Sequence, residues 1–333
     1  MTKGVRNISI LGDGGWGTTL AIYLIRKNYH VQLWGAFPDY IEKIKRTRIN
    51  YKFLPGITIP KEVELTSDLK IAISKAQLII LAIPSQYARP ILKRLRVYDL
   101  SKKIFMSVIK GIDNTTLLRM SQIIYKELGS VRLAVLSGPN IAREIARGVP
   151  STAVVASHDR SITKKLQAIL NSEKFRIYTN ADVIGVELGG SLKNVIAIAC
   201  GVCDGLGYGA NTKAAILTRG LAEIARLGKA LGAKNQTFSG LSGLGDLVTT
   251  CFSSQSRNRY VGEELGKGKT IQQITSSMDM IAEGIATVKA AYKLSQKYHV
   301  PMPITREVYN IIYKDKRPLK AVMGLMKRKM KAE

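Results

Sequence analysis

Short apolar runs recur along the chain as far as about residue 180, and stretches with apolar residues at helical spacing separate them. Runs of this kind are typical of strands buried on both faces of a parallel sheet. The pattern predicts strands at 6–11, 30–34, 76–83, 103–109, 132–137, 152–157 and 175–179. Helical segments between them include 18–28, 85–96, 116–128 and 160–171. This alternation predicts a doubly wound α/β (Rossmann) domain, with a mainly parallel sheet covered by helices on both faces.

Beyond Asp182 the strand-like runs stop, and every segment has helical spacing. The expected helices are 183–203, 211–232, 257–266, 282–298, 304–314 and 318–328. We therefore expect a dinucleotide-binding domain at 1–182 and an all-helical substrate-binding and catalytic domain at 183–333. No flexible linker separates them, so the two are expected to pack tightly, with a cleft between them.

The charge balance of the 333 residues is strongly basic: 51 Lys and Arg against 24 Asp and Glu give a net charge of +27. Such an excess attracts anions, among them nucleic acids, acidic membrane surfaces and phosphorylated metabolites. The cations are scattered, apart from a modest cluster, "MKRKMK", near the C-terminus. A nucleic-acid module usually concentrates them with interleaved aromatics, so a small anionic partner is favoured.

The apolar runs and the cysteines indicate a cytoplasmic protein without a metal site. The longest run, "LIILAIP" from Leu78, is far shorter than the roughly 20 residues that span a bilayer. The N-terminus lacks the apolar core of a signal peptide. Three cysteines without framework spacing fit a reducing compartment, and "CGVC" at Cys200–Cys203 lacks the second ligand pair of a zinc site.

The stretch "ILGDGGWGTTL" carries the pattern G-x-G-x-x-G in a specific context, after a predicted strand and at the start of a predicted helix. There Gly12 permits a tight turn, Gly14 lets a pyrophosphate approach the backbone, and Gly17 lets the helix pack closely on the strand. The diphosphate then lies at the helix N-terminus, where free N–H groups favour negative charge. Trp16 is either a lid over this cofactor or part of the core.

The acidic residue that usually follows the second strand and binds the adenosine ribose of NAD is missing. "LWGAF" has Gly35 and Ala36 there, so a ribose 2′-phosphate is not repelled. Cations near enough in sequence to help hold that phosphate are Lys43, Lys45, Arg46 and Arg48. The choice between NAD and NADP therefore stays open.

Four further clusters place polar residues in apolar surroundings. They are "SVIKGID" with Lys110, "LSGPNIAREI" with Gly138 and Asn140, "ELGGSLKNVIAIACG" with Lys193 and Asn194, and "GLSGLGDLVTTCFSSQSRNRYVGEEL". Lys110 and Asn140 follow predicted strands, and ligands of doubly wound sheets bind beyond the carboxyl ends of strands. We expect the clusters to share the cofactor cleft.

Seven motifs stand in a characteristic order: the glycine loop with Trp16, "KGI" at Lys110, "SGPN.A.E", "LKN" at Lys193, "GLGDL..T" at 243–250, "SRNR" at 256–259 and "EG" at 283–284. In these motifs and over essentially its whole length, the chain resembles the bacterial NAD(P)-dependent glycerol-3-phosphate dehydrogenases. The resemblance implies a Rossmann domain joined to a helical domain of the 6-phosphogluconate dehydrogenase-like type. It also implies a homodimer that reversibly reduces dihydroxyacetone phosphate to sn-glycerol 3-phosphate, the backbone of phospholipids.

The resemblance implies that Lys193 is the general acid/base, with Lys110, Asn194 and Asp246 orienting and polarising the carbonyl group. A lysine can act in this way only if its pKa falls from the ordinary ~10.4. Burial beside the apolar run Val195–Cys200 and the nearby charge of Lys110 would both lower it. Lys110 and Asp246 join Lys193 as the expected catalytic set.

The remaining site residues also follow from the resemblance. Expected substrate contacts are Lys110, Gly138, Asn140, Asn194, Asp246, Thr250, Ser256, Arg257 and Asn258. Expected cofactor contacts are Gly12, Gly14, Gly15, Trp16, Gly17, Lys110, Ala142, Arg257 and Glu283. Arg257 and Asn258 match the phosphate-binding residues, at a helix start where backbone N–H groups and a guanidinium can hold a phosphate together. Asn140 departs from the family's usual Ser or Thr, although its amide can still donate a hydrogen bond.

Two alternatives remain from the residues alone. A related two-domain reductase, such as a hydroxyacid dehydrogenase or ketopantoate reductase, would share the cofactor loop but would not require the phosphate cluster at 256–259. A nucleic-acid-binding protein on a Rossmann scaffold is suggested only by the net charge, and it would show a steep salt dependence. The same charge predicts at most a weak peripheral attraction to acidic membranes.

Overall fold

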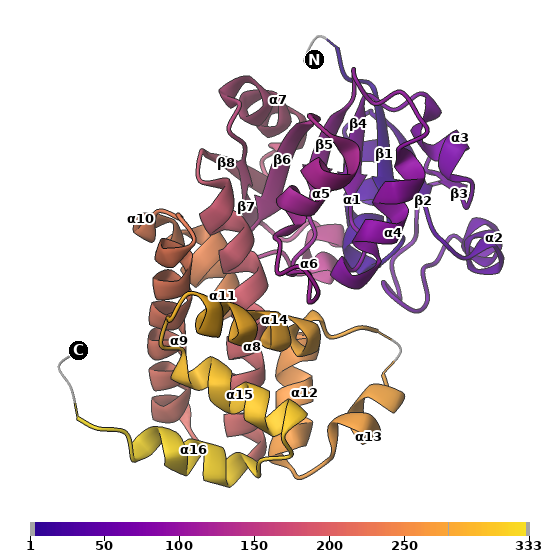
Figure 1. The fold of residues 1–333 in the computed structure, drawn as a ribbon. Coiled ribbons are helices and arrows are strands. Elements are labelled where there is room, and N and C mark those ends of the chain that lie inside the picture. The colour runs from indigo at the N-terminus through magenta and orange to yellow at the C-terminus, as the bar shows by residue number, and fades with distance from the viewer. Residues whose placement is uncertain (1–3, 279, 331–333) are drawn as a thin grey trace. The chain divides into compact units, whose positions relative to one another are not determined.

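A computed structural model describes residues 4–278 and 280–330 of the chain. These residues form two compact units. The first comprises residues up to 110 together with 119–187, and the second comprises 111–118 together with the chain from 188 onward. Figure 1 shows the first unit in indigo to magenta and most of the second in orange to yellow.

The first unit is built on an eight-stranded sheet with the order β3-β2-β1-β4-β5-β6-β7-β8. Its strands are β1 (Asn7–Leu11), β2 (His30–Trp34), β3 (Glu64–Thr66), β4 (Leu78–Leu81), β5 (Ile104–Ser107), β6 (Arg132–Ser137), β7 (Ser151–Ala156) and β8 (Phe175–Asn180). All neighbours are parallel except β6 and β7, which are antiparallel. The predicted mainly parallel sheet is confirmed, and β3 is an additional short edge strand.

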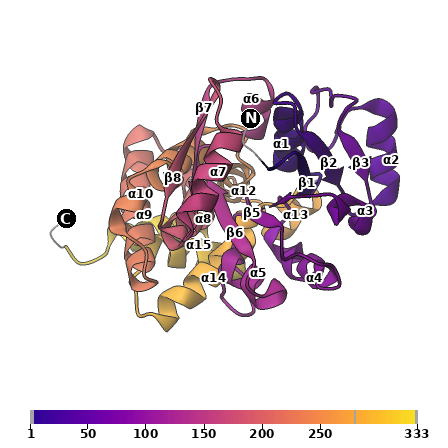
Figure 2. The same ribbon diagram turned by 90° about the horizontal axis from the view of Figure 1, so that it is seen from above.

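Helices cover both faces of this sheet. They are α1 (Gly15–Ile25), α2 (Pro38–Thr47), α3 (Leu69–Ser74), α4 (Ser85–Leu95), α5 (Met120–Leu128), α6 (Ala142–Ala146) and α7 (Arg160–Leu170). Figure 2 shows α1 on one side of the strands and α4 and α5 on the other. Every residue of β4 and β5 is consequently buried, which explains their continuous apolar sequences. The strand order reverses between β1 and β4, the point at which ligands of such sheets bind.

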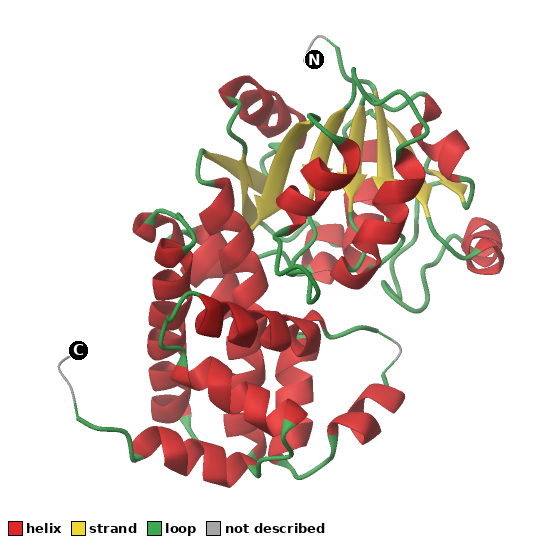
Figure 3. Ribbon diagram, in the orientation of Figure 1, coloured by secondary structure: helices red, strands yellow, loops and turns green. Residues whose placement is uncertain are grey.

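From residue 188 onward, the regular elements of the second unit's described residues are all helices, joined by loops (Figure 3). After α8 (Val183–Gly205), whose first five residues count with the first unit, come α9 (Ala210–Ala230), α10 (Asn235–Phe238), a π-helical turn η1 (Leu241–Gly245), α11 (Asp246–Phe252), α12 (Arg257–Gly266), α13 (Ile271–Ser276), α14 (Glu283–Lys297), α15 (Pro303–Tyr313) and α16 (Pro318–Met326). The predicted all-helical C-terminal half is confirmed.

Glycines bring α8 and α12 into close contact. A Cβ atom at Gly201 would lie 2.0 Å from the carbonyl oxygen of Arg259, and one at Gly262 would lie 2.0 Å from that of Ile198. Any larger residue would push the helices apart. This contact fixes the relative position of two helices that carry predicted site residues, Lys193 on α8 and Arg257 on α12.

Helix α8 is a core helix of the second unit. Among the described residues it is the one helix long and apolar enough to cross a membrane, but 94% of its apolar window is buried inside the protein. Cys200 and Cys203 lie on it as buried free thiols, and burial raises the pKa of Cys203 to about 11. Within the described ranges, no group of three His, Cys, Asp or Glu residues is arranged to hold a metal ion.

Candidate active site

The glycine loop between β1 and α1 has three distinct environments. Gly12 has a φ of 122°, and a Cβ atom there would lie 2.5 Å from the carbonyl oxygen of Ala82. A Cβ at Gly17 would lie 1.9 Å from the carbonyl oxygen of Gly12, so the helix packs tightly on the loop. Gly14, by contrast, faces open space, with no atom within 4 Å of the position that a Cβ atom would take.

The N-terminus of α1 is well suited to an anion. Gly14 is its N-cap residue, so no side chain caps the helix, and the first turn contains no acidic residue. The free N–H groups of this turn therefore adjoin the open space at Gly14, where they can donate to a phosphate. These features fit a dinucleotide pyrophosphate.

Trp16 packs as part of the core of the first unit. Its ring contacts the hydrophobic core and meets Phe175 edge to face, with ring centroids 6.4 Å apart. Of the two interpretations of Trp16, lid or core, the packing favours the core. A contact between its backbone and the cofactor stays a prediction.

A carboxylate that the sequence analysis overlooked lies at the end of β2. A Cβ atom at Gly35, the residue after β2, would be 2.7 Å from Oδ2 of Asp13. The side chain of Asp13 therefore occupies the space that a side chain at position 35 would need. Oδ2 is buried and has no hydrogen-bond partner in the protein, and burial raises the pKa of Asp13. The sequence feature that could have revealed this carboxylate is the Asp within the "GDGG" turn.

The buried carboxyl group of Asp13 should make the protein less stable as the pH rises. Its folded-state pKa lies above the ordinary value of 3.8. The loss of folding free energy caused by burying this group is therefore absent below pH 3.8, and it grows as the pH rises toward the folded-state pKa. Asp13→Asn should therefore raise the melting temperature of the cofactor-free protein at neutral pH, and this gain should vanish in acid. Thermal unfolding across pH measures it, with the exposed Glu62→Gln as the control. An equal gain at both ends of the pH range would contradict the assignment.

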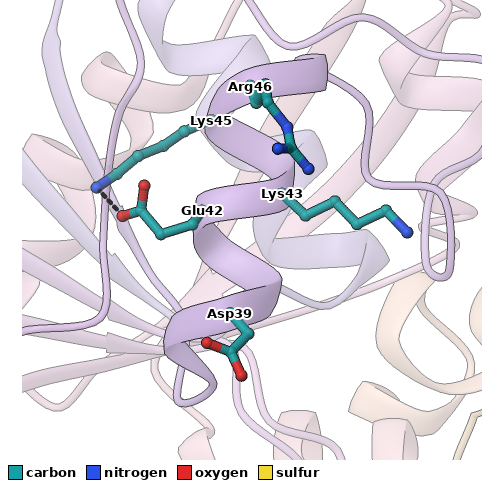
Figure 4. Close-up of a pocket in the computed structure, with 5 residues that line it drawn as sticks. All are labelled: Asp39, Glu42, Lys43, Lys45 and Arg46. Carbon is teal, nitrogen blue, oxygen red and sulfur yellow. Dashed lines mark hydrogen bonds and ion pairs between the residues drawn. The ribbon is translucent and has the colours of Figure 1, made fainter.

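Figure 4 shows three of the four cations after β2, which extend from different sides of α2. Lys45 makes an ion pair with Glu42 at 2.5 Å, and Arg48 donates to the carbonyl oxygen of Val63 at 3.0 Å. Lys43 and Arg46 extend from the other side of α2, and neither pairs with Glu42. All three cations, with Asp39 and Glu42, line a surface hollow. Lys43 and Arg46 are thus better placed than Lys45 and Arg48 to meet an external phosphate.

Three predicted site residues of the first unit lie at the carboxyl ends of β5 and β6. Lys110 donates from Nζ to the carbonyl oxygen of Gly138 at 3.1 Å, and Gly138 has a φ of 144°. Asn140 donates from Nδ2 to the carbonyl oxygen of Thr152 at 3.0 Å, while its Oδ1 is buried without a partner. One of the two N–H groups of the Asn140 amide is therefore used within the protein, and the other is the one that can donate to a substrate.

Ala142 connects this region to the glycine loop. Its carbonyl oxygen accepts a hydrogen bond from the Thr19 hydroxyl at 3.0 Å, and its Cβ lies 3.8 Å from the position of a Cβ at Gly15. The first turn of α6 thus packs directly against the turn that begins α1. The structure brings Ala142 together with the predicted cofactor-binding glycines.

Lys193 is the centre of a buried polar cluster in the second unit. The side chain projects from α8, and Nζ donates to Oδ1 of Asp246 and, at 2.5 Å, to Oγ1 of Thr250. The Thr250 hydroxyl donates in turn to the carbonyl oxygen of Asp246 at 2.7 Å. Lys193 is 6% exposed and Asp246 only 1%, so water screens this ion pair little.

The approach of α11 to α8 depends on glycines. A Cβ atom at Gly189 would lie 2.3 Å from the carbonyl oxygen of Ser242, and one at Gly243 would lie 2.1 Å from that of Phe238. The turn that precedes α11 can therefore fold closely against α8. This places Asp246 and Thr250, which share one face of α11, directly on Lys193.

A second buried network orients two amides. Asn258 on α12 donates from Nδ2 to Oδ1 of Asn194 at 2.8 Å and accepts at Oδ1 from the backbone N–H of Gly284 at 2.9 Å. Since Asn194 accepts through its oxygen, the NH₂ group is what it can still offer to a ligand. Both side chains are held in one orientation.

Arg257 lies in the first turn of α12 on the surface, and its Nη1 donates to the carbonyl oxygen of Ile281 at 2.7 Å. Ser256 caps this helix by accepting from the backbone N–H of Arg259. The hydroxyl of Ser256 thus has a structural role, and its contact with substrate stays a prediction. Glu283 begins α14 two residues after Ile281.

Family comparisons cover most of the chain. The model described as NAD-dependent glycerol-3-phosphate dehydrogenase N-terminus matches residues 7–163, and the corresponding C-terminus model matches residues 182–323. A "Glycerol-3-phosphate dehydrogenase [NAD(P)+]" of Prosthecochloris aestuarii is 46% identical over 329 residues, covering 98% of this chain and 99% of the relative.

Solved structures separate the possible reductase classes. A glycerol-3-phosphate dehydrogenase from Coxiella burnetii matches with a TM-score of 0.94 and 37% identity, covering 97% of this chain and 99% of that one. A PanE/ApbA family ketopantoate reductase from Ralstonia eutropha matches with a TM-score of 0.61 and 15% identity, covering 95% and 99%. At that identity the second match shows only a shared fold.

Proposed function

Because this chain belongs to the NAD-dependent glycerol-3-phosphate dehydrogenase family, we propose that residues 1–182 bind the dinucleotide and residues 183–333 bind and protonate the substrate. The enzyme interconverts dihydroxyacetone phosphate and sn-glycerol 3-phosphate by hydride transfer with NAD or NADP, and so supplies glycerol 3-phosphate for phospholipid synthesis. The family assignment excludes the ketopantoate reductase alternative.

The buried contact of Lys193 with Asp246 and Thr250 carries the proposed mechanism. The nicotinamide of the bound cofactor supplies the hydride. Lys193 holds a proton on Nζ and gives it to the carbonyl oxygen of the substrate, and in the reverse direction it takes that proton from the hydroxyl group. Burial of Lys193 favours the neutral amine, whereas the carboxylate beside it favours the ammonium, so the two effects oppose each other.

Asp246 and Thr250 keep the amine of Lys193 in place, because both accept from Nζ. The amide of Asn194, oriented by Asn258, donates to a substrate oxygen. Lys110 adds positive charge from the end of β5. Each of these groups polarises or positions the carbonyl group without itself exchanging the proton.

The phosphate of the substrate binds at the start of α12. Arg257 offers a guanidinium there, and the first turn of the helix offers backbone N–H groups. The other proposed substrate contacts are Gly138, Asn140, Ser256 and Asn258. The proposed cofactor contacts are Gly12, Gly14, Gly15, Trp16, Gly17, Lys110, Ala142, Arg257 and Glu283.

Reduction of dihydroxyacetone phosphate by the purified protein tests the activity and the cofactor preference together. We expect oxidation of the reduced cofactor that depends on the substrate, with both NADH and NADPH, because the two residues that follow β2, Gly35 and Ala36, are not acidic. The loss of cofactor absorbance measures the rate. Equal rates with a 2-keto acid and with dihydroxyacetone phosphate would contradict the proposed phosphate site.

Alanine substitutions at two glycines of the loop should separate cofactor binding from folding. Gly14→Ala places a methyl group in open space, so the fold should keep its stability while the affinity for NADH falls at least about ten-fold, because the methyl group fills the space for the pyrophosphate. Gly17→Ala places a methyl group 1.9 Å from a carbonyl oxygen and should lower the melting temperature itself. Thermal unfolding and NADH fluorescence titration measure the two effects. Unchanged NADH affinity in Gly14→Ala would refute the proposed pyrophosphate position.

We propose that the enzyme is soluble and works in the cytoplasm as a homodimer on small phosphorylated substrates, without a specific nucleic-acid partner. Burial of the apolar helix α8 supports a soluble enzyme. Light scattering coupled to size-exclusion chromatography tests the dimer, and a mass equal to one chain would refute it.

A further inference from the structure

The outer face of α16 leaves a stripe of large apolar side chains exposed. Leu319, Met323 and Met326 are 51%, 48% and 81% exposed, and Met330 just beyond the helix is 101% exposed. Spacings of four and three residues put the first three on one side of the helix. The other side, with the buried Ala321, packs on the second unit, where α16 contacts α12 and α15.

The segment that carries this stripe is rich in cations. Between residues 314 and 330 the only acidic residue is Asp315. The basic residues in the same segment are Lys314, Lys316, Arg317, Lys320, Lys327, Arg328 and Lys329. Seven positive charges and one negative charge give this segment a net charge of +6, although Lys316 also pairs with Glu307 on α15. The last lysine of "MKRKMK" lies outside the described residues.

We propose that α16 and the basic segment after it form a docking surface for membranes that contain anionic phospholipids. An apolar stripe flanked by Lys and Arg is the arrangement with which a helix lies in the interface of a bilayer. The apolar side chains enter the boundary between headgroups and acyl chains, and the cations meet the lipid phosphates. This binding would hold the enzyme at the surface where a glycerol phosphate is acylated into lipid, and it does not depend on the proposed catalytic residues.

Charge and composition favour a lipid surface over two other partners. A second copy of the chain on this face would place the same cations opposite one another, because a two-fold interface pairs a patch with itself. A single-stranded nucleic acid would need aromatic side chains for base stacking, and residues 314–330 contain none. An anionic bilayer satisfies both the apolar and the cationic residues.

Co-sedimentation of the full-length enzyme with vesicles tests the proposal. The vesicles are phosphatidylcholine alone or phosphatidylcholine with roughly 30% phosphatidylglycerol, at low ionic strength and at about 1 M salt. We expect binding only to the anionic vesicles, with most of it lost in high salt. Absence of binding at low ionic strength would overturn the proposal.

Two variants and two matched controls assign the binding to α16. Lys320→Gln with Lys327→Gln should weaken binding about 30-fold, and Lys75→Gln with Lys102→Gln, which removes the same charge from exposed sites in the first unit, should not. Replacing Leu319, Met323 and Met326 by Gln should weaken it roughly ten-fold or more, whereas Val97→Gln, at a residue 81% exposed, should not. Turnover of dihydroxyacetone phosphate should be unchanged in all four, which separates this test from that of the catalytic proposal.

The remaining outcomes each decide against the proposal. Equal weakening by the control lysines would show only a general effect of the net charge. Loss of a dimer in the Leu319, Met323 and Met326 variant, without vesicle binding by the wild type, would identify the face as an interface between copies. Binding to a polynucleotide that the apolar variant leaves intact, with no vesicle binding, would identify a nucleic-acid surface.

Discussion

Lys193→Met is expected to lower kcat/KM for dihydroxyacetone phosphate by about 10²- to 10⁴-fold, the usual contribution of a positioned general acid. Methionine keeps the length and apolar stem of lysine but has no proton to give. The affinity for NADH should stay unchanged, because the proposed cofactor contacts do not include Lys193. Steady-state kinetics and NADH fluorescence titration measure the two quantities. Full turnover in the variant would refute the proposed role of Lys193.

Loss of stability must be separated from loss of chemistry, since Lys193→Met leaves the buried Asp246 without its ion pair. Such an unpaired charge typically costs about 3–5 kcal/mol. Two companion variants resolve this. Lys193→Met with Asp246→Asn removes both charges and should regain stability without regaining activity. Lys193→Arg keeps a positive charge beside Asp246 but releases its proton far less readily, so it too should fold and remain inactive. The exposed Lys229→Met is the control for a lysine change as such.

Arg257→Gln is expected to raise KM for dihydroxyacetone phosphate by about 10- to 150-fold, the range that follows from losing a hydrogen bond to a charged group. The decisive comparison uses dihydroxyacetone, which lacks the phosphate. Wild-type enzyme should strongly prefer the phosphorylated substrate, and the variant should lose most of that preference while its rate with dihydroxyacetone stays the same.

The kinetics of Arg257→Gln also separate its two proposed contacts. A raised dissociation constant for NADH in the absence of substrate would indicate the cofactor contact, and a change confined to KM for dihydroxyacetone phosphate would indicate the phosphate contact alone. The exposed Arg306 on α15 provides the control, and Arg306→Gln should leave all of these values unchanged. Undiminished preference for the phosphorylated substrate in Arg257→Gln would place the phosphate elsewhere.

The sequence by itself determined the fold class and the order of its elements. Strands buried on both faces must be apolar at every position, as β4 and β5 are, so they stand out as continuous runs. In helices that are buried on one side, the apolar residues recur at helical spacing. Strand β3 escaped prediction because it has three residues, of which only Leu65 is buried, too few to show a period.

The glycine loop could also be predicted from the sequence, because the wider range of backbone conformations open to glycine follows from its lack of a Cβ atom. Gly12 and Gly17 occupy positions where a Cβ atom would strike a carbonyl oxygen, so no other residue type suits them. Asp13, one residue along, shows the limit of this reasoning. Its identity was visible, but its position against Gly35 depends on how β1 and β2 pair.

Only the tertiary structure decided which side chains of the second unit meet. Lys193 and Asp246 are 53 residues apart, and Asn194 and Asn258 are 64 apart. Periodicity shows which face of a helix is buried, but it does not show which other helix covers that face. Close approach of backbones, through Gly189 to the turn before α11 and through Gly201 to α12, selects the partners. The position of the Asp246 carboxylate beside Lys193 is therefore decided by packing, because only folding removes the intervening water and holds the two charges together.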